Sequence, residues 1–312
     1  MTGLAQQADN SFPAAAYGTY KVGRSSGDST DPVAVESAIK AALDAGYRCF
    51  DCAQFYENEK EIGEVLWKHA NREEIYVISK VWTTTVYEGP EAVLKQLEQS
   101  LKDLQIGYVD LYLIHWPVPG KHVEAYKALQ GFVGPDKKIR RLGLSNYTVL
   151  DYQELMSAEG ITVTPYSNQF EVNPWLYRKK TISFFQQAGL KLQAYRPFAD
   201  GRLLREENAP EEIKKIVAAH PGKTTAQVLL RWGVQKGWQV LPKSSTPSRI
   251  AENVKIFDFD LSEEEIAILD GLGKQEEYET AFKKNYEKCI VRDTPVAGSM
   301  TGKVPRWFDE ED

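Results

Sequence analysis

The sequence lacks long apolar runs, and we expect no leader segment. Its most apolar run, from Val109 to Val118, contains Asp110 and His115 and is far shorter than the ~20 residues of a membrane span. The first residues have neither a basic start nor a long apolar core, so no signal peptide is visible. We therefore expect a cytoplasmic protein with no membrane partner.

Cysteine and positive charge are also scarce. Three cysteines in 312 residues provide no disulfide framework. Cys49 and Cys52 form a C-x-x-C, but residues three apart in a strand face opposite sides, so we interpret both as packing residues and expect no metal site. Lys and Arg number 38 against 44 Asp and Glu, and this net charge of −6 argues against a nucleic-acid partner. A small anionic cofactor needs only a local basic cluster.

From about residue 14 the chain alternates short β-rich runs with longer amphipathic ones. Strands are predicted over residues 14–18, 47–51, 75–80, 109–114, 140–144, 163–168, 190–195 and 238–241. Helices are predicted over residues 32–45, 59–69, 90–104, 123–132, 149–157, 176–188, 224–235 and 247–256. Residues 210–220 and 262–269 are expected to form extra helices outside the repeat.

Eight strands that alternate with helices predict an α/β fold with a parallel sheet, and eight units favour closure into a (β/α)8 TIM barrel. No flexible linker divides the chain, so we expect a single barrel domain over residues 1–272. Residues 273–312 lose periodicity and are predicted to form a C-terminal tail, partly ordered because Trp307 and Phe308 suggest packing.

Polar residues follow three successive strands. Asp51, Lys80 and His115 end the second, third and fourth predicted strands, and Tyr56 lies in the loop after Asp51. Barrel enzymes place their chemistry at this rim, so we expect the four side chains to converge. Lys80 would pair with Asp51 and lower the pKa of Tyr56 from ~10, which makes Tyr56 a general acid for a carbonyl oxygen. A neutral His115 would hydrogen-bond the same oxygen.

Several long motifs carry a resemblance to a known family. The segment Asp51-Cys-Ala-Gln-Phe-Tyr56-Glu-Asn-Glu-Lys-Glu-Ile-Gly63 resembles the aldo-keto reductase signature D-x-A-x-x-Y-x-N-E-x-x-x-G. Ile-His115-Trp-Pro and Leu241-Pro-Lys243-Ser-Ser resemble two further hallmarks, as do Gly143-Leu-Ser145-Asn146 and Asn168-Gln169. The resemblance runs from about residue 14 to about residue 271.

The resemblance implies an NADPH-dependent oxidoreductase that reduces aldehydes or ketones to alcohols. The matching catalytic residues are Asp51, Tyr56, Lys80 and His115, with Tyr56 as proton donor and nicotinamide C4 as hydride donor. The residues expected at the substrate are Tyr20, Tyr56, Trp82, His115 and Trp116. The C-terminal tail is expected to border the substrate pocket.

The resemblance also implies a cofactor site. Ser145, Asn146 and Gln169 would hold the carboxamide, Tyr195 would stack on the nicotinamide, and Lys243 and Arg249 would bind the 2′-phosphate, which favours NADPH over NADH. Arg196 stands where the family usually has Ser, and the sequence leaves two positions open for its side chain: in contact with the pyrophosphate, which is our hypothesis, or turned to solvent. The full set is Gly18, Thr19, Tyr20, Asp51, Ser145, Asn146, Gln169, Tyr195, Arg196, Pro197, Phe198, Lys243, Ser244, Ser245, Arg249, Glu252 and Asn253.

Other functions remain open on the sequence alone. One is a non-catalytic, NADPH-sensing barrel subunit, and another is a barrel lyase or isomerase. Among reductases, the sequence does not separate a general aldehyde or aldose reductase from a polyol, xylose or glycerol type or a prostaglandin F synthase-like enzyme. A small-molecule carbonyl substrate and a monomeric state are the expectations that the resemblance favours.

Overall fold

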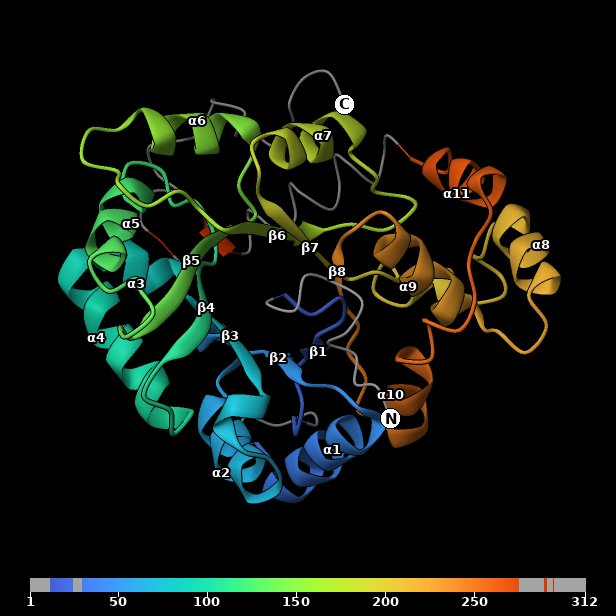
Figure 1. Cartoon of the computed structure of the whole chain (residues 1–312), viewed down its shortest axis with the longest axis horizontal. Helices are drawn as coiled ribbons and strands as arrows, with labels where there is room; N and C mark the ends of the chain where they lie inside the picture. The colour runs from blue at the N-terminus through green and yellow to red at the C-terminus, as the bar shows by residue number, and fades with distance from the viewer. Residues whose placement is uncertain (1–11, 25–29, 275–288, 291–293, 295–312) are drawn as a thin grey trace.

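The computed structural model describes residues 12–24, 30–274, 289–290 and 294. In this part of the chain, eight parallel strands follow one another around a central axis, and helices surround them (Figure 1). The strands are β1 Tyr17–Gly18, β2 Cys49–Asp51, β3 Tyr76–Val81, β4 Val109–Ile114, β5 Ile139–Ser145, β6 Ser167–Glu171, β7 Lys191–Tyr195 and β8 Gln239–Leu241. The predicted (β/α)8 barrel is confirmed.

The barrel closes between its first and last strands. Ala15 pairs with Val240 in a parallel bridge, and the amide of Gly18 donates to the carbonyl of Pro242 at 3.1 Å. Alternate strand residues point inward and form a small buried cluster that contains Cys49, whereas Cys52 packs in the larger cluster between strands and helices. The two thiols are free and face opposite sides, as the strand interpretation predicted.

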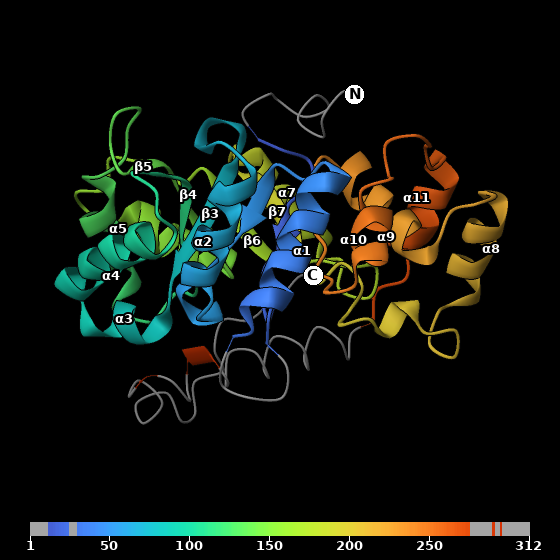
Figure 2. The ribbon, with the colours of Figure 1, turned by 90° about the horizontal axis from the view of Figure 1, so that it is seen from below.

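The described helices lie close to their predicted positions. Their bounds are α1 Pro32–Ala45, α2 Glu59–His69, α3 Thr83–Glu88, α4 Pro90–Asp103, α5 His122–Gln130, α6 Val149–Ser157, α7 Lys179–Gln187, α8 Glu211–Ala219, α9 Thr225–Gln235, α10 Pro247–Asn253 and α11 Glu263–Asp270. Short 3-10 turns are η2 Gln54–Tyr56, η3 Arg72–Glu74 and η4 Arg202–Leu204. The extra helices α8 and α11 lie at one side of the molecule (Figure 2).

Several local predictions differ from the structure, and three of the differences have a clear physical reason. The sixth strand begins at Ser167 instead of residue 163, because Pro165 has no amide hydrogen to donate to a neighbouring strand. Helix α7 starts at Lys179 instead of residue 176, because the Asn173 side chain accepts from the amides of Trp175 and Leu176 and holds a turn there. Helix α3 was not predicted, since its six residues are too few to show a period.

The predicted tail lies largely outside the described residues, including Trp307 and Phe308. Of its few described residues, Ile290 is fully buried and Cys289 lines the large cavity discussed below. That the tail borders the substrate pocket stays a prediction.

Gly63 of α2 is required by a close approach between helices. A Cβ at this position would lie 2.6 Å from the carbonyl oxygen of Asp103 and 2.7 Å from the Cα of Leu104, at the end of α4. Because these are backbone atoms, neither can move cheaply. We expect Gly63→Ala to lower the free energy of unfolding by about 1–3 kcal/mol and the melting temperature by several degrees.

Thermal unfolding followed by circular dichroism measures this effect. Gly107→Ala is the matched control, because no atom lies within 4 Å of the added Cβ. Equal melting temperatures for the two variants would contradict the steric argument.

Candidate active site

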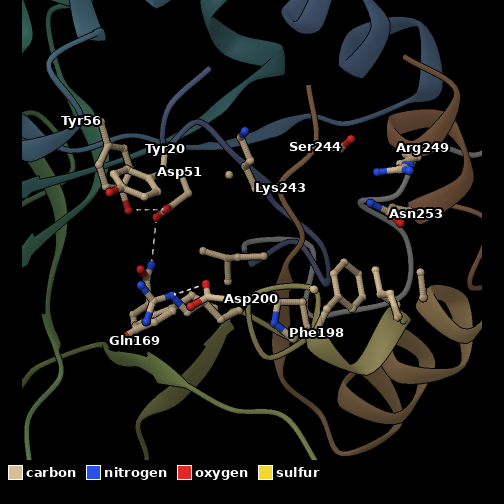
Figure 3. Close-up of a pocket in the computed structure, with 18 of the residues that line it drawn as sticks. Tyr20, Asp51, Tyr56, Gln169, Phe198, Asp200, Lys243, Ser244, Arg249 and Asn253 are labelled. Atoms are coloured by element: carbon tan, nitrogen blue, oxygen red, sulfur yellow. Dashed lines mark hydrogen bonds and ion pairs between the residues drawn. The ribbon is translucent and has the colours of Figure 1, made fainter. Parts of the chain in front are cut away.

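The carboxyl ends of three neighbouring strands bring the predicted catalytic residues together. Asp51 is the last residue of β2, Lys80 is one residue from the end of β3, and His115 directly follows β4. Tyr56 ends the 3-10 turn η2, which returns the chain over the end of β2. We call these four residues the tetrad; Tyr56 and Asp51 are seen at one end of the cavity in Figure 3.

Lys80 is the centre of the tetrad. Its side chain is fully buried, and Nζ lies 2.7 Å from Asp51 Oδ1, 2.9 Å from the carbonyl oxygen of Cys52 and 3.2 Å from the Tyr56 hydroxyl. These three partners use the three hydrogens of the ammonium group. Gln169 Nε2 also donates to Asp51 Oδ1 at 2.9 Å, so both charged groups have their partners. The predicted ion pair is present.

The pKa of Tyr56 differs from the sequence-based expectation. Burial, with the nearby Asp51 carboxylate as the second cause, raises this pKa well above its usual value. The expected lowering by Lys80 fails because Asp51 already neutralises the ammonium and faces the phenol, with 3.4 Å between its Oδ2 and the hydroxyl oxygen. Tyr56 is therefore a neutral phenol at pH 7 and keeps a proton to donate.

His115 is neutral for a related reason. Burial and, second, the charge of Lys80 lower the pKa of His115 well below its usual value. Its Nδ1 atom is buried and has no hydrogen-bond partner among the described residues. With its proton on Nε2, the neutral imidazole would donate a hydrogen bond into the cavity that it lines. The Trp82 ring meets it edge-on, with 4.8 Å between ring centres.

The ends of β5, β6 and β7 form a second polar group. Asn146 has a left-handed backbone with φ of 61°, and its Nδ2 donates to the carbonyl oxygen of His115 at 2.9 Å. Its Oδ1 accepts from the Tyr195 hydroxyl at 2.7 Å. Ser145 Oγ donates to the carbonyl oxygen of Gln169. These bonds fix the positions of three residues predicted to hold the carboxamide.

A cavity of about 1020 Å³ begins at the tetrad and runs past the end of β8 (Figure 3). Predicted residues on its wall are Gly18, Tyr20, Asp51, Tyr56, Trp82, His115, Trp116, Asn146, Gln169, Tyr195, Arg196, Pro197, Phe198, Lys243, Ser244, Arg249, Glu252 and Asn253. Lys80, Thr19 and Ser145 are fully buried and do not line it. Ser245 is exposed and accepts from Lys243 Nζ at 3.0 Å.

The sequence did not indicate every residue of the wall. Phe55 stacks on Trp82 with 3.9 Å between ring centres, and its only signal is its place beside Tyr56. The other unpredicted residues are Asp200, Gly201, Leu204, Arg205, Thr224, Thr225, Ala226, Leu241 and Cys289. They come from the loop after β7, the start of α9, the end of β8 and the tail.

Residues 15–274 match the model of the Aldo/keto reductase family. The chain belongs to this family. It is 38% identical to the glyoxal reductase of Bacillus subtilis over 240 residues, which span 77% of this chain and 83% of that protein. It is 36% identical to human aldo-keto reductase family 1 member A1 over 295 residues, 85% of this chain and 89% of the relative.

Solved structures agree with this placement. The aldose reductase of Schistosoma japonicum is 35% identical with a TM-score of 0.74, over 85% of this chain and 90% of that one. An aldo-keto reductase of Bombyx mori in complex with NADP is 29% identical, also with a TM-score of 0.74, over 84% of this chain and 90% of that one. Aldo-keto reductases use NADPH, and this member is an oxidoreductase that acts on carbonyl groups.

The aldo-keto reductase signature contains residues of the tetrad and residues that hold the surrounding structure in place. Asp51 and Tyr56 belong to the tetrad, but Asn58 is fully buried and donates to the carbonyl oxygens of Thr19 and Val22, which positions the chain after β1. Glu59 accepts hydrogen bonds from two buried serine hydroxyls, and Gly63 allows α2 to approach α4. The motif therefore specifies the scaffold around the site as well as the site.

Two further observations concern only the described residues. No group of three or more His, Cys, Asp or Glu side chains is placed to hold a metal ion in that part of the aldo-keto reductase. None of the helices found there combines the length and hydropathy needed to cross a membrane.

Proposed function

We propose that this aldo-keto reductase uses NADPH to reduce small aldehydes and ketones, with Tyr56 as the proton donor. The observation that carries the proposal is a single cavity that joins the tetrad to a basic region. Ser244 and Arg249 line the far end, beyond the end of β8, and Lys243 lies between that end and Asp51 (Figure 3). A long anionic cofactor would therefore reach from the basic end to the reacting atoms.

The residues present fit NADPH. Lys243 and Arg249 are exposed on the cavity wall, and neither pairs with a carboxylate among the described residues. The Lys243 ammonium group is partly desolvated by the cavity wall and lies near the charge of Lys21, and both effects lower its pKa. Because the two positive charges are close together, both lysines would attract an added phosphate. The volume of about 1020 Å³ is also sufficient for a large ligand. When bound, NADPH supplies the hydride.

The chain's own residues supply the remaining steps. The neutral Tyr56 phenol donates its proton to the substrate oxygen as negative charge develops there. Lys80, at 3.2 Å, stabilises the phenolate that remains, and Asp51 holds Lys80 in place. His115 donates a hydrogen bond from Nε2 to the same substrate oxygen and so orients the carbonyl group.

The wall near the tetrad favours apolar or small carbonyl compounds. Tyr20, Phe55 and Trp82 form a run of stacked rings, with Trp116 also on the wall. The names of the glyoxal and aldose reductases among the relatives favour small aldehydes. Polyol, xylose or glycerol reduction and a prostaglandin F synthase-like activity are the alternatives.

We further propose that the protein is cytoplasmic and monomeric. Size-exclusion chromatography with light scattering would test the oligomeric state.

The test is NADPH oxidation, followed by absorbance, with a panel of carbonyl compounds. The panel contains an aromatic aldehyde, glyoxal, glyceraldehyde, xylose, a quinone and a ketosteroid. We expect the aldehydes to be reduced with a higher kcat/KM than xylose or the ketosteroid. Tight NADPH binding without turnover on any compound would reject the proposal and favour a sensing subunit.

Arg249 should determine the preference for NADPH. Charge-assisted hydrogen bonds to a phosphate are worth about 1.5–3 kcal/mol, so Arg249→Ala should raise the Kd for NADPH about 10- to 100-fold. The Kd for NADH should change little, because NADH has no 2′-phosphate. Fluorescence titration measures both constants, and Lys68→Ala, an exposed residue on α2, is the control. Equal losses for the two cofactors would contradict this role.

A further inference from the structure

The segment that follows β7, residues 196–205, is strained and lines the cofactor cavity. Arg196, Ala199 and Asp200 have φ values of 48°, 49° and 56°. These values lie in the left-handed region, which is unfavourable for residues other than glycine. Phe198, Asp200 and other residues of this segment form one side of the cavity (Figure 3). A backbone with three such residues persists only when its surroundings hold it in place.

The Arg196 side chain lies between two carboxylates that flank this turn. One guanidinium nitrogen is 3.1 Å from Glu171 Oε2, and Nε is 2.9 Å from Asp200 Oδ1. The carbonyl oxygen of Arg196 accepts from Asn173 Nδ2 at 3.3 Å, and the amide of Ala199 donates to the same oxygen at 3.0 Å. Arg196 therefore connects the end of β6 to the strained turn through both its side chain and its backbone.

The two ion pairs differ in their surroundings. The Glu171 side chain is only 5% exposed, whereas that of Asp200 is 66% exposed. An exposed pair contributes little, because water screens it. A buried carboxylate without its cation strongly destabilises the folded state. The ion pair with Glu171 therefore keeps Arg196 in place. Burial raises the pKa of Glu171, and the charge of Arg196 is the largest cause that opposes this rise.

We infer that Arg196 is a positioning residue: through Glu171 it holds residues 196–205 in the strained form that shapes the cofactor cavity. In this role it acts through the segment instead of by direct contact with the pyrophosphate that the sequence suggested. The inference rests on the proposed function, because the segment matters for binding only if NADPH occupies this cavity.

A double-mutant cycle on NADPH binding separates the two roles. Arg196→Gln and Glu171→Gln should each raise the Kd for NADPH about tenfold, and the double variant should show no further loss, because both changes remove the same contact. If Arg196 bound the pyrophosphate directly, Arg196→Gln would raise the Kd for NADPH by the same factor in the Glu171→Gln variant as in the wild-type protein. That additive result would overturn the inference.

A second variant tests whether weaker NADPH binding reflects only a general loss of stability. Arg72 pairs with Asp110 at 2.7 Å, at the opposite end of the barrel, and both side chains are largely buried. Arg72→Gln should lower the melting temperature without changing the Kd for NADPH. A rise in Kd in this variant as large as that in Arg196→Gln would mean that the binding loss reflects stability alone and would overturn the inference.

Hydrogen–deuterium exchange on the cofactor-free protein gives a readout that does not depend on the proposed function. The turn contains amide hydrogen bonds from Arg202 to the Ala199 carbonyl and from Leu203 to the Phe198 carbonyl. Both single variants should exchange these amides about tenfold faster than the wild-type protein. Unchanged exchange would overturn the inference. If the wild-type protein failed to bind NADPH while exchange still rose, the proposed function alone would fail.

Discussion

Tyr56→Phe should lower kcat for carbonyl reduction about 10²- to 10⁴-fold, the range that a well-placed general acid contributes. The change removes the phenolic oxygen, which lies 3.2 Å from Lys80 Nζ and 3.4 Å from Asp51 Oδ2. The ring itself stays, and it packs against the Tyr20 ring with 5.2 Å between centres. The Kd for NADPH should therefore change less than about threefold.

Steady-state kinetics with an aldehyde and fluorescence titration with NADPH measure the two quantities. Tyr152→Phe is the matched control: it removes the hydroxyl of a buried tyrosine on α6, which does not line the cavity, and should leave kcat unchanged. A Tyr56→Phe enzyme that retained more than a tenth of the wild-type kcat would assign the proton to another donor.

The pKa of Tyr56 also sets the pH dependence. Because burial raises this pKa, the phenol stays protonated as pH rises, and the wild-type rate of reduction should be constant from pH 7 to about 9. A phenol with a lowered pKa would lose its proton in that range, and the rate would fall. The pH profile of kcat therefore distinguishes the raised pKa from the lowered one that the sequence suggested.

The tetrad could be predicted because its positions follow from the strand pattern. Asp51, Lys80 and His115 each end an apolar run, and parallel strands bring such ends to one rim. The electrostatics could not be predicted in the same way. The pKa of Tyr56 depends on depth of burial and on the 3.4 Å approach of Asp51, and neither distance nor depth is encoded in the spacing of the residues.

The side walls of the cavity were predicted less well, for a different physical reason. Phe55 and Thr225 lie in a 3-10 turn and at the start of α9, where neither the strand nor the helix period fixes the direction of a side chain. Arg196 could be singled out as unusual, but its partner Glu171 lies on another strand, and only the folded chain shows their contact.

Lys80→Met should destabilise the protein as well as inactivate it. The Lys80 side chain is fully buried and that of Asp51 is 4% exposed, so the change leaves a buried carboxylate without its cation. We expect the free energy of unfolding to fall by about 3–5 kcal/mol. The Gln169 amide still donates to Asp51, but a neutral hydrogen bond does not replace the lost charge. Reduction should fall at least as far as in Tyr56→Phe, because no cation remains to stabilise the phenolate.

The double variant Lys80→Met with Asp51→Asn separates stability from catalysis. It removes both charges, and the asparagine can still accept from Gln169, so we expect most of the lost stability to return. Turnover should not return, because the ammonium beside Tyr56 is still absent. Urea unfolding and NADPH oxidation measure the two effects in parallel. If the double variant were as unstable as Lys80→Met, the unpaired Asp51 carboxylate would not be the cause of the destabilisation. If turnover returned, Tyr56 would need no neighbouring cation to act as the proton donor.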